Sequence, residues 1–124
     1  MKFDGVQMNL GNIMKLSDAV TRSITAENPF GEKGGGGRAL PGVAPAEAKA
    51  LNQLEHEGSA RASGELGQKW KVRPFIAIAA KSTAIIADIK GPGVIQHIWI
   101  TTNFQQKRDL IIRMYWDGES TPSV

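Results

Sequence analysis

The sequence has 124 residues, of which 41% are hydrophobic and 22% charged, which is typical of a folded domain and not of a disordered chain. It contains no cysteine, which excludes disulfides, thiolate metal sites and a cysteine nucleophile. The formal net charge is +3. The N-terminus lacks the apolar core of a signal peptide, and no apolar run is long enough to span a bilayer, so we expect a soluble, cytoplasmic chain without a membrane partner.

Residues 9–20 carry the first helical pattern. Ile13, Leu16 and Val20 recur at helical spacing, although Gly11 weakens the pattern. We predict one or two helical turns that dock onto a larger body. This short helix opens an N-terminal helical and glycine-rich region that we assign to residues 1–69.

Residues 21–45 are rich in glycine and proline and include four consecutive glycines, Gly34 to Gly37. Such a segment is either a flexible linker or a functional loop. The flanking side chains of Phe30, Glu32, Lys33 and Arg38 would suit a binding loop. The sequence leaves both alternatives open.

Residues 45–57 give the strongest helix prediction. Pro45 suits the first helical position, the alanines favour the helix, and Gly58 can end it. The apolar stripe of Ala50, Leu51 and Leu54 is narrow, which predicts a surface helix. His56 is then expected to be an exposed histidine near the helix end and not a metal ligand, because the segment offers no further ligands.

From Trp70 the hydrophobic period changes to two, which predicts strands over residues 70–78, 83–89, 94–102 and 109–116. Pro74 suggests an edge strand or a bulge in the first of them. We therefore predict a mainly β fold, an antiparallel jelly roll or sandwich, over residues 70–124. Asp117-Gly118 marks a turn, and residues 121–124 read as the start of a fifth strand, which predicts an N-terminal fragment of something longer.

Residues 88–102 combine a rigid Gly91-Pro92-Gly93 turn with a strand that is apolar on both faces. Such a strand is expected to lie between two layers. His97, on the same face as Trp99, is most simply a buried, hydrogen-bonded histidine. The alternative places it against a ligand, with the flat face of Trp99 stacked on a sugar ring.

Known catalytic patterns are weak. Gly31 and Gly36 have phosphate-loop spacing, but Gly37-Arg38 stands where Lys-Ser/Thr should be, so nucleotide binding is disfavoured. No recognisable pair of strand carboxylates or nucleophile elbow is present, and Asp88 is expected to cap a turn. Residues 59–124 carry 9 basic and 5 acidic side chains without a basic run, so we expect no nucleic-acid partner. We expect no metal and no cofactor.

Five blocks of sequence, in order, resemble the N-terminal part of glycoside hydrolase family 172, formerly catalogued as domain of unknown function 2961. The blocks are SITAENP at residues 23–29, GEKGGGGRA at 31–39, ELGQKWKVRP at 65–74, ADIKGPGVIQHIW at 87–99 and LIIRMYWDGE at 110–119.

The resemblance implies a double jelly-roll fold, of which this chain would hold part of the first jelly roll. It also implies homo-oligomers, trimers or multiples of them, and retaining cleavage or transfer of α-D-fructofuranosyl or D-arabinofuranosyl groups. The two catalytic glutamates of the family are expected downstream of this chain, so no residue here inherits a catalytic role and the isolated chain should be inactive. The alternative function is a non-catalytic β-module for carbohydrate binding or oligomerisation.

A furanoside pocket would use glycine N–H groups and polar side chains for hydroxyls, with an aromatic ring against the sugar. The residues expected to bind a carbohydrate substrate are Glu27, Asn28, Phe30, Lys33, Arg38, His97 and Trp99.

Overall fold

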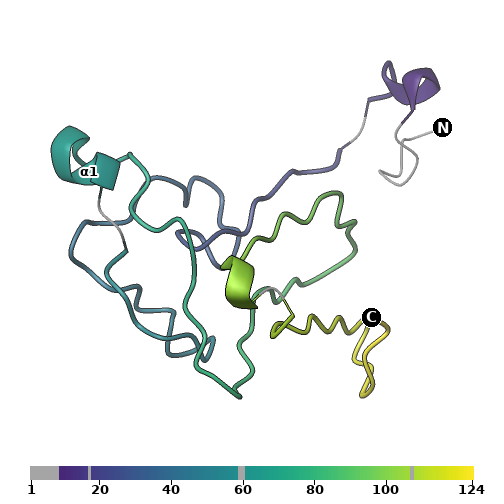
Figure 1. Cartoon of the computed structure of the whole chain (residues 1–124). Coiled ribbons are helices and arrows are strands. Elements are labelled where there is room, and N and C mark those ends of the chain that lie inside the picture. Colours follow the sequence, from purple (N-terminus) through teal and green to yellow (C-terminus); the bar gives the residue numbers. More distant parts are fainter. Residues whose placement is uncertain (1–8, 17, 59–60, 107) are drawn as a thin grey trace. The chain divides into compact units, whose positions relative to one another are not determined.

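The computed structural model describes residues 9–16, 18–58, 61–106 and 108–124 (Figure 1). The chain divides into two compact units, Met1–Pro92 and Gly93–Val124, which we describe one at a time. Residues 1–8, on which the absence of a signal peptide rests, lie outside the described residues.

The first helical element, η1 (Leu10–Asn12), is a single 3₁₀ turn. The N–H of Asn12 donates to the carbonyl of Asn9 at 2.9 Å, and that of Lys15 to Asn12 at 3.0 Å. One of the one or two helical turns predicted within residues 9–20 is therefore confirmed, whereas residues 15, 16 and 18–20 are not helical and residue 17 is not described. Ile13 and Leu16 are exposed, so the described residues provide no surface on which this turn docks.

The predicted surface helix over residues 45–57 is wrong: the segment forms successive turns. Its N–H groups bond three, four and five residues back, from Ala48 to Pro45, from Leu51 to Glu47 and from Gln53 to Ala48. Asn52 has φ 53°, a left-handed conformation that ends any helical run. Tertiary contacts of the buried Leu51 and Ala48 override local helix propensity here.

A helix that the sequence did not predict, α1 (Arg61–Leu66), follows instead (Figure 1). Gly67 ends it at φ 81°, with its N–H donating to the carbonyl of Ser63 at 2.9 Å, which is the left-handed glycine cap. Gly64 and Ser63 are weak helix formers, and six residues are too few for a clear periodicity. The cap glycine was the one local signal available.

Within the described part of the first unit, the buried hydrophobic core consists of Ala48, Leu51 and Val72. Residues 45–57, which we call the turn segment, bond to residues 77–85 through backbone groups and through the side-chain amides of Asn52 and Gln53. Leu54 donates to Ala77 at 2.8 Å in an isolated bridge, and Ile85 donates to Leu51 at 2.9 Å. Residues 70–78 and 83–89, predicted as strands, thus bond to the turn segment and form no ladder with each other among the described residues.

His56 is not the exposed helix-end histidine that the sequence predicted. It is half-buried and stacks on Phe75, with ring centroids 4.8 Å apart and planes at 8°. The N–H of Gly58 donates to Nδ1 at 3.1 Å, so Nε2 carries the proton and donates to the carbonyl of Phe75 at 3.0 Å. The loss of the helix places this side chain against the neighbouring segment.

The second unit contains η2 (Phe104–Gln106) and a turn at Asp117-Gly118. Both turn residues have positive φ, 47° and 82°, and Glu119 donates to Trp116 at 2.9 Å, which defines a type I′ turn. The predicted turn is confirmed. Met114 then pairs with the end of the chain, donating to Val124 at 3.0 Å and accepting from Ser123 at 2.8 Å.

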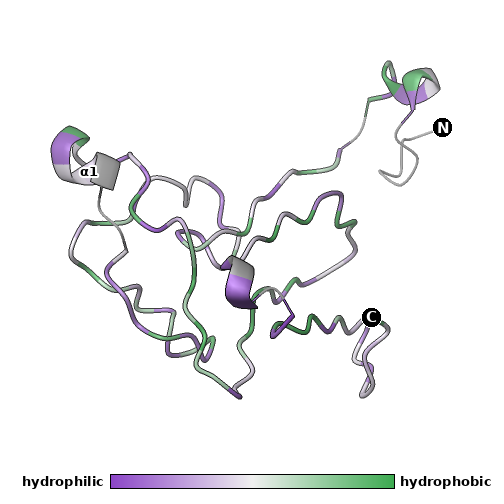
Figure 2. Ribbon diagram, viewed as in Figure 1, coloured by the Kyte–Doolittle hydropathy of each residue, from purple (hydrophilic) through white to green (hydrophobic). Residues whose placement is uncertain are grey.

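Residues 94–102 and 109–116 of the second unit have no ladder partner in the described part of the chain. Hydrophobic and hydrophilic stretches alternate along this trace (Figure 2). Both faces of the predicted inner strand are exposed: Ile98 and Ile100 on one, Ile95 and Trp99 on the other. His97 is exposed too, so the simplest prediction, a buried histidine, is wrong, because no second layer of described residues covers it.

The described residues contain few helices and two isolated β-bridges, between Thr25 and Asn28 and between Leu54 and Ala77. Within the same residues, no helix has the length and apolar character needed to cross a membrane. A predominantly non-helical chain is therefore seen, but the predicted sheets are not assembled.

Candidate functional site

The glycine-rich loop begins with a tight reversal at residues 25–28. The N–H of Thr25 donates to the carbonyl of Asn28 at 3.1 Å, and the N–H of Asn28 returns the bond at 3.0 Å. The Thr25 hydroxyl also accepts from the N–H of Asn28 at 3.2 Å, a local bond that threonine commonly makes in turns. Pro29 then opens a second turn, closed by Gly31 donating to Asn28 at 3.1 Å.

The side-chain amide of Asn28 joins the two ends of this loop. Its Nδ2 donates to the carbonyls of Ser23 at 3.3 Å and Glu32 at 3.0 Å. Its Oδ1 accepts from the N–H of Glu32 at 2.9 Å. Both amide donors are used by the backbone, so Asn28 holds the loop closed. These bonds favour an ordered loop over a flexible linker.

Two glycines of the run have defined structural reasons. Gly34 has φ 69° at the third position of a turn in which Gly35 donates to Glu32 at 3.1 Å, a type II position that requires positive φ. A Cβ on Gly35 would lie 2.5 Å from Oδ1 of Asn28, so only glycine leaves room for that side chain. A Cβ on Gly36, in contrast, would meet nothing within 4 Å.

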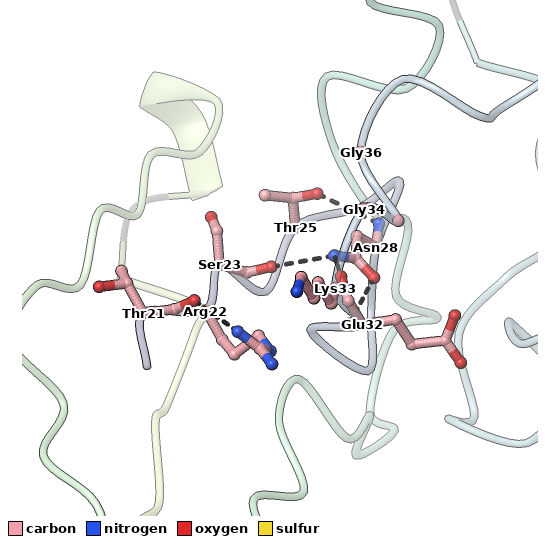
Figure 3. Close-up of a pocket in the computed structure, with 10 residues that line it drawn as sticks. Thr21, Arg22, Ser23, Thr25, Asn28, Glu32, Lys33, Gly34 and Gly36 are labelled. Carbon is pink, nitrogen blue, oxygen red and sulfur yellow. Dashed lines mark hydrogen bonds between the residues drawn. The ribbon is translucent and has the colours of Figure 1, made fainter. Parts of the chain in front are cut away.

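The folded loop borders an open cavity of about 310 Å³. The residues that line it are Thr21, Arg22, Ser23, Thr25, Asn28, Glu32, Lys33, Gly34, Gly35 and Gly36 (Figure 3). The cavity therefore combines hydroxyls, an amide, two cations, one carboxylate and glycine backbone. This mixture provides donors and acceptors for a small polar ligand.

Glu27 connects the loop to the chain that follows α1. Its Oε1 accepts from the N–H of Val72 at 2.5 Å and of Arg73 at 2.7 Å. Val72 is fully buried and Arg73 is 5% exposed, so these N–H groups have no access to water. Arg73 also donates from Nη2 to the carbonyl of Val43. The Glu27 carboxylate therefore anchors the loop to residues 72 and 73, and Glu27 is not among the residues that line the cavity.

The other predicted site residues are distributed as follows. Asn28 and Lys33 line the cavity, whereas Phe30, which is exposed, does not. Arg38 is not a lining residue, but a Cβ on Gly34 would lie 3.6 Å from its Nη2, so its guanidinium lies beside the cavity wall. His97 and Trp99 belong to the second unit. Whether any of them binds a sugar stays a prediction.

Sequence reasoning missed Thr21 and Arg22, which line the cavity together with Ser23, the first residue of the SITAENP block. Thr21 and Arg22 precede that block and form no known motif. The one available signal was that a turn at Asn28-Pro29 reverses the chain, which returns the residues after the turn towards those before it.

The carboxylates of the turns have local partners. Asp88, expected to cap a turn, pairs with Lys90 across 3.0 Å. Glu119 accepts from the hydroxyl of Ser123 at 2.5 Å and from the N–H of Trp116 at 3.3 Å, and these two bonds lower the pKa of its carboxyl below the ordinary 4.5. The described residues contain no group of three or more histidine, cysteine, aspartate or glutamate side chains that would hold a metal ion.

Comparison with known proteins gives one match. A family model described as GH172 first beta-sandwich domain matches residues 59–124, just over half of the chain. Neither the curated proteins nor the solved structures contain a match. The matched residues include Val72 and Arg73, to which Glu27 bonds, whereas the cavity loop precedes the matched segment.

Proposed function

The chain belongs to glycoside hydrolase family 172, and from this we propose that it is the N-terminal part of a retaining hydrolase of α-D-fructofuranosides or D-arabinofuranosides. Its residues 59–124 correspond to the first β-sandwich domain of the family. Retaining hydrolysis needs two carboxyl groups, one as nucleophile and one as acid and base. We propose that both come from outside this chain, so that the 124 residues alone bind sugar without cleaving it.

The observation that carries this proposal is the bond between the cavity loop and the matched domain. Glu27 accepts two N–H groups from Val72 and Arg73, and Asn28, the next residue, closes the loop around the cavity. The loop is therefore held by the family domain although it lies outside the matched residues. Hydroxyls and free backbone N–H groups around a cavity of about 310 Å³ suit the polar edges of one furanose ring.

A titration of the ¹⁵N-labelled chain with methyl α-D-arabinofuranoside tests sugar binding. We expect the amide resonances of Gly34 and Gly36 to shift, and those of residues 114–124 to stay in place. Methyl α-D-xylopyranoside, a six-membered ring, is the control and should shift them much less. Equal shifts with both sugars, or none, would contradict a furanoside site in this loop.

A release assay with p-nitrophenyl α-D-arabinofuranoside tests whether the chain binds the sugar without cleaving it. We expect no nitrophenol above background from the chain, because its sequence shows no recognisable pair of strand carboxylates and the proposed catalytic pair lies outside it. Turnover by the chain alone would show that the catalytic pair lies within these residues.

The second candidate is a non-catalytic module that binds carbohydrate or assembles homo-oligomers, trimers or their multiples. The exposed apolar residues of the second unit favour it; Trp99 is 73% and Ile111 75% exposed. Light scattering of the purified chain, combined with the furanoside titration, tests the oligomerising form of this module. A discrete trimer without furanoside binding would favour that form, whereas furanoside binding would count against a module that only assembles oligomers.

A further inference from the structure

The cavity loop carries more positive charge than a neutral sugar needs. Arg22 and Lys33 line the cavity, and the guanidinium of Arg38 lies beside its Gly34 wall. In the described part of the chain none of these three cations has an ion-pair partner; Arg22 donates to the carbonyl of Thr21 at 2.9 Å. Residues 1–58 carry 6 basic and 7 acidic side chains, so this half of the sequence has no excess of positive charge. The three cations come together through the fold of the loop.

Backbone donors lie in the same place. The loop uses the N–H groups of Gly31, Glu32 and Gly35 internally. Those of Lys33, Gly34 and Gly36 have no acceptor among the described residues, and all three residues line the cavity. Consecutive backbone N–H groups in a glycine turn form the concavities that bind anions in other proteins.

Glu32 is the one acidic residue of the cavity lining, and it does not neutralise the cations. Its carboxylate lies beyond 4.0 Å from the charged nitrogens of Arg22 and Lys33, since no ion pair joins them. Figure 3 shows its side chain extending away from Arg22 and Ser23. The hydroxyls of Thr21 and Ser23 supply two further donors on the side of Arg22.

We infer that this cavity binds an oxyanion, the phosphate or carboxylate group of an acidic sugar, through Arg22, Lys33 and the free backbone N–H groups of Lys33, Gly34 and Gly36. The inference rests on the proposed function for the sugar part of the ligand. The anionic group is the additional element: charge-assisted bonds from guanidinium and ammonium groups are about twice as strong as neutral ones, whereas a furanose hydroxyl would leave the cations unpaired.

The test uses the whole 124-residue chain and four probes: inorganic phosphate, ribose 5-phosphate, methyl α-D-arabinofuranosiduronate and methyl α-D-arabinofuranoside. The three sugars all carry a five-membered ring, so they differ in the anionic group. Binding is followed by ¹⁵N shifts of Lys33, Gly34 and Gly36. We expect ribose 5-phosphate or the furanosiduronate to bind at roughly millimolar Kd, at least tenfold more tightly than the neutral furanoside. The probe that binds more tightly shows whether the cavity prefers a phosphate or a carboxylate. Raising sodium chloride from 20 to 200 mM should weaken binding several-fold, because salt screens exposed charges.

Two variants and one control locate the site. Lys33→Gln and Arg22→Gln should each weaken binding of the anionic probe by roughly tenfold, the loss of one charge-assisted bond. Lys49→Gln removes the same charge from an exposed position outside the cavity and should leave binding unchanged. All three positions are exposed, so the spectra of the unliganded variants should keep the dispersion of the parent.

The outcomes separate the two proposals. Anion binding that Lys33→Gln weakens and Lys49→Gln does not supports the inference. Equal affinity for ribose 5-phosphate and methyl α-D-arabinofuranoside would overturn it and leave the furanoside function intact. Binding of phosphate alone, with no added affinity from a sugar, would support the anion site and count against the furanoside function. Anion binding that all three variants weaken equally would overturn the inference as a nonspecific charge effect.

Discussion

The two units of the chain satisfy their polar and apolar groups in different ways. In the Met1–Pro92 unit, side chains bond to distant backbone: Glu27 reaches Val72, Gln53 reaches Ile85 and Gln68 reaches Arg38. In the Gly93–Val124 unit the side-chain bonds from Ser123 and Trp116 to Glu119 and from Gln105 to Asn103 join residues two to four positions apart. The first unit is therefore held by tertiary contacts and the second by local turns.

The two units also differ in how far their apolar side chains are buried. Among the described residues, the buried hydrophobic ones are Ala48, Leu51 and Val72, all in the first unit, whereas large hydrophobic residues of the second unit are exposed on both faces of residues 94–102. Because a sandwich strand buries its inner face against the opposite sheet, the second unit needs further cover to reach the fold its family implies. The first unit holds the candidate cavity, whereas the second unit exposes an apolar surface.

The largest effect is expected for Gly58→Ala. A Cβ there would lie 2.3 Å from the carbonyl oxygen of the buried Val72, and φ is 85°. Overlap with backbone and left-handed strain together should cost about 4 kcal/mol of unfolding free energy in urea titrations. Gly42→Ala, at φ 73° but in open space, should cost only about 1 kcal/mol. Equal losses would mean that packing at Gly58 is looser than described.

Leu51→Ala tests the core directly. Leu51 is 5% exposed, and truncating a buried leucine costs about 3 kcal/mol. Ile111→Ala in the second unit, at 75% exposure, should cost less than about 0.5 kcal/mol. Thermal unfolding of both variants measures the difference. A costly Ile111→Ala would show that the second unit buries this side chain in solution, for instance against another copy.

Glu27→Ala tests the connection between loop and domain. The change leaves the N–H groups of Val72 and Arg73 buried without an acceptor, which should cost about 2 kcal/mol. Glu32→Ala, at an exposed carboxylate, should cost less than about 0.5 kcal/mol. Hydrogen exchange at Val72 gives the most local readout. Unchanged protection of that amide in Glu27→Ala would refute the connection.

The smallest effect concerns pH. Bonds from Ser123 and from Trp116 lower the pKa of Glu119 below 4.5 in the folded turn. A lowered folded pKa means that this carboxylate supports the turn fully above pH 4.5, and that the support is lost as the pH falls through the folded value. Ser123→Ala should move the pKa of Glu119 back towards 4.5 in a carboxyl NMR titration. A pKa that does not move would assign the shift to Trp116 alone.

Part of the fold was predictable because its signals are local. Asp117-Gly118 requires positive φ at two successive positions, which that dipeptide favours, and the type I′ turn follows. The helix over residues 45–57 failed for the opposite reason. Its propensity is good, but burial of Leu51 and bonds to residues 77 and 85 decide its conformation, and these contacts are distant in sequence. Strand patterns indicated β structure without indicating which segments pair.

The candidate site was predictable in composition and not in geometry. Asn28, Lys33 and the glycines were singled out as a possible binding loop, and they do border the cavity. Glu27 was predicted as a substrate ligand, yet its carboxylate faces backbone amides 45 and 46 residues away, a contact that no spacing rule anticipates. Thr21 and Arg22 escaped notice because only the reversal at Asn28 brings them to the glycines.

The order of residues 28 and 29 also affects the chemical ageing of the protein. Asparagine deamidates when the backbone nitrogen of the next residue attacks its side-chain carbonyl, and the reaction requires an N–H that proline lacks. Asn28 is followed by Pro29, so this route is closed for the amide that binds Ser23 and Glu32. Deamidation would replace its two donors with a carboxylate and set a negative charge against both carbonyls. The same proline that turns the loop therefore preserves its central amide over the lifetime of the molecule.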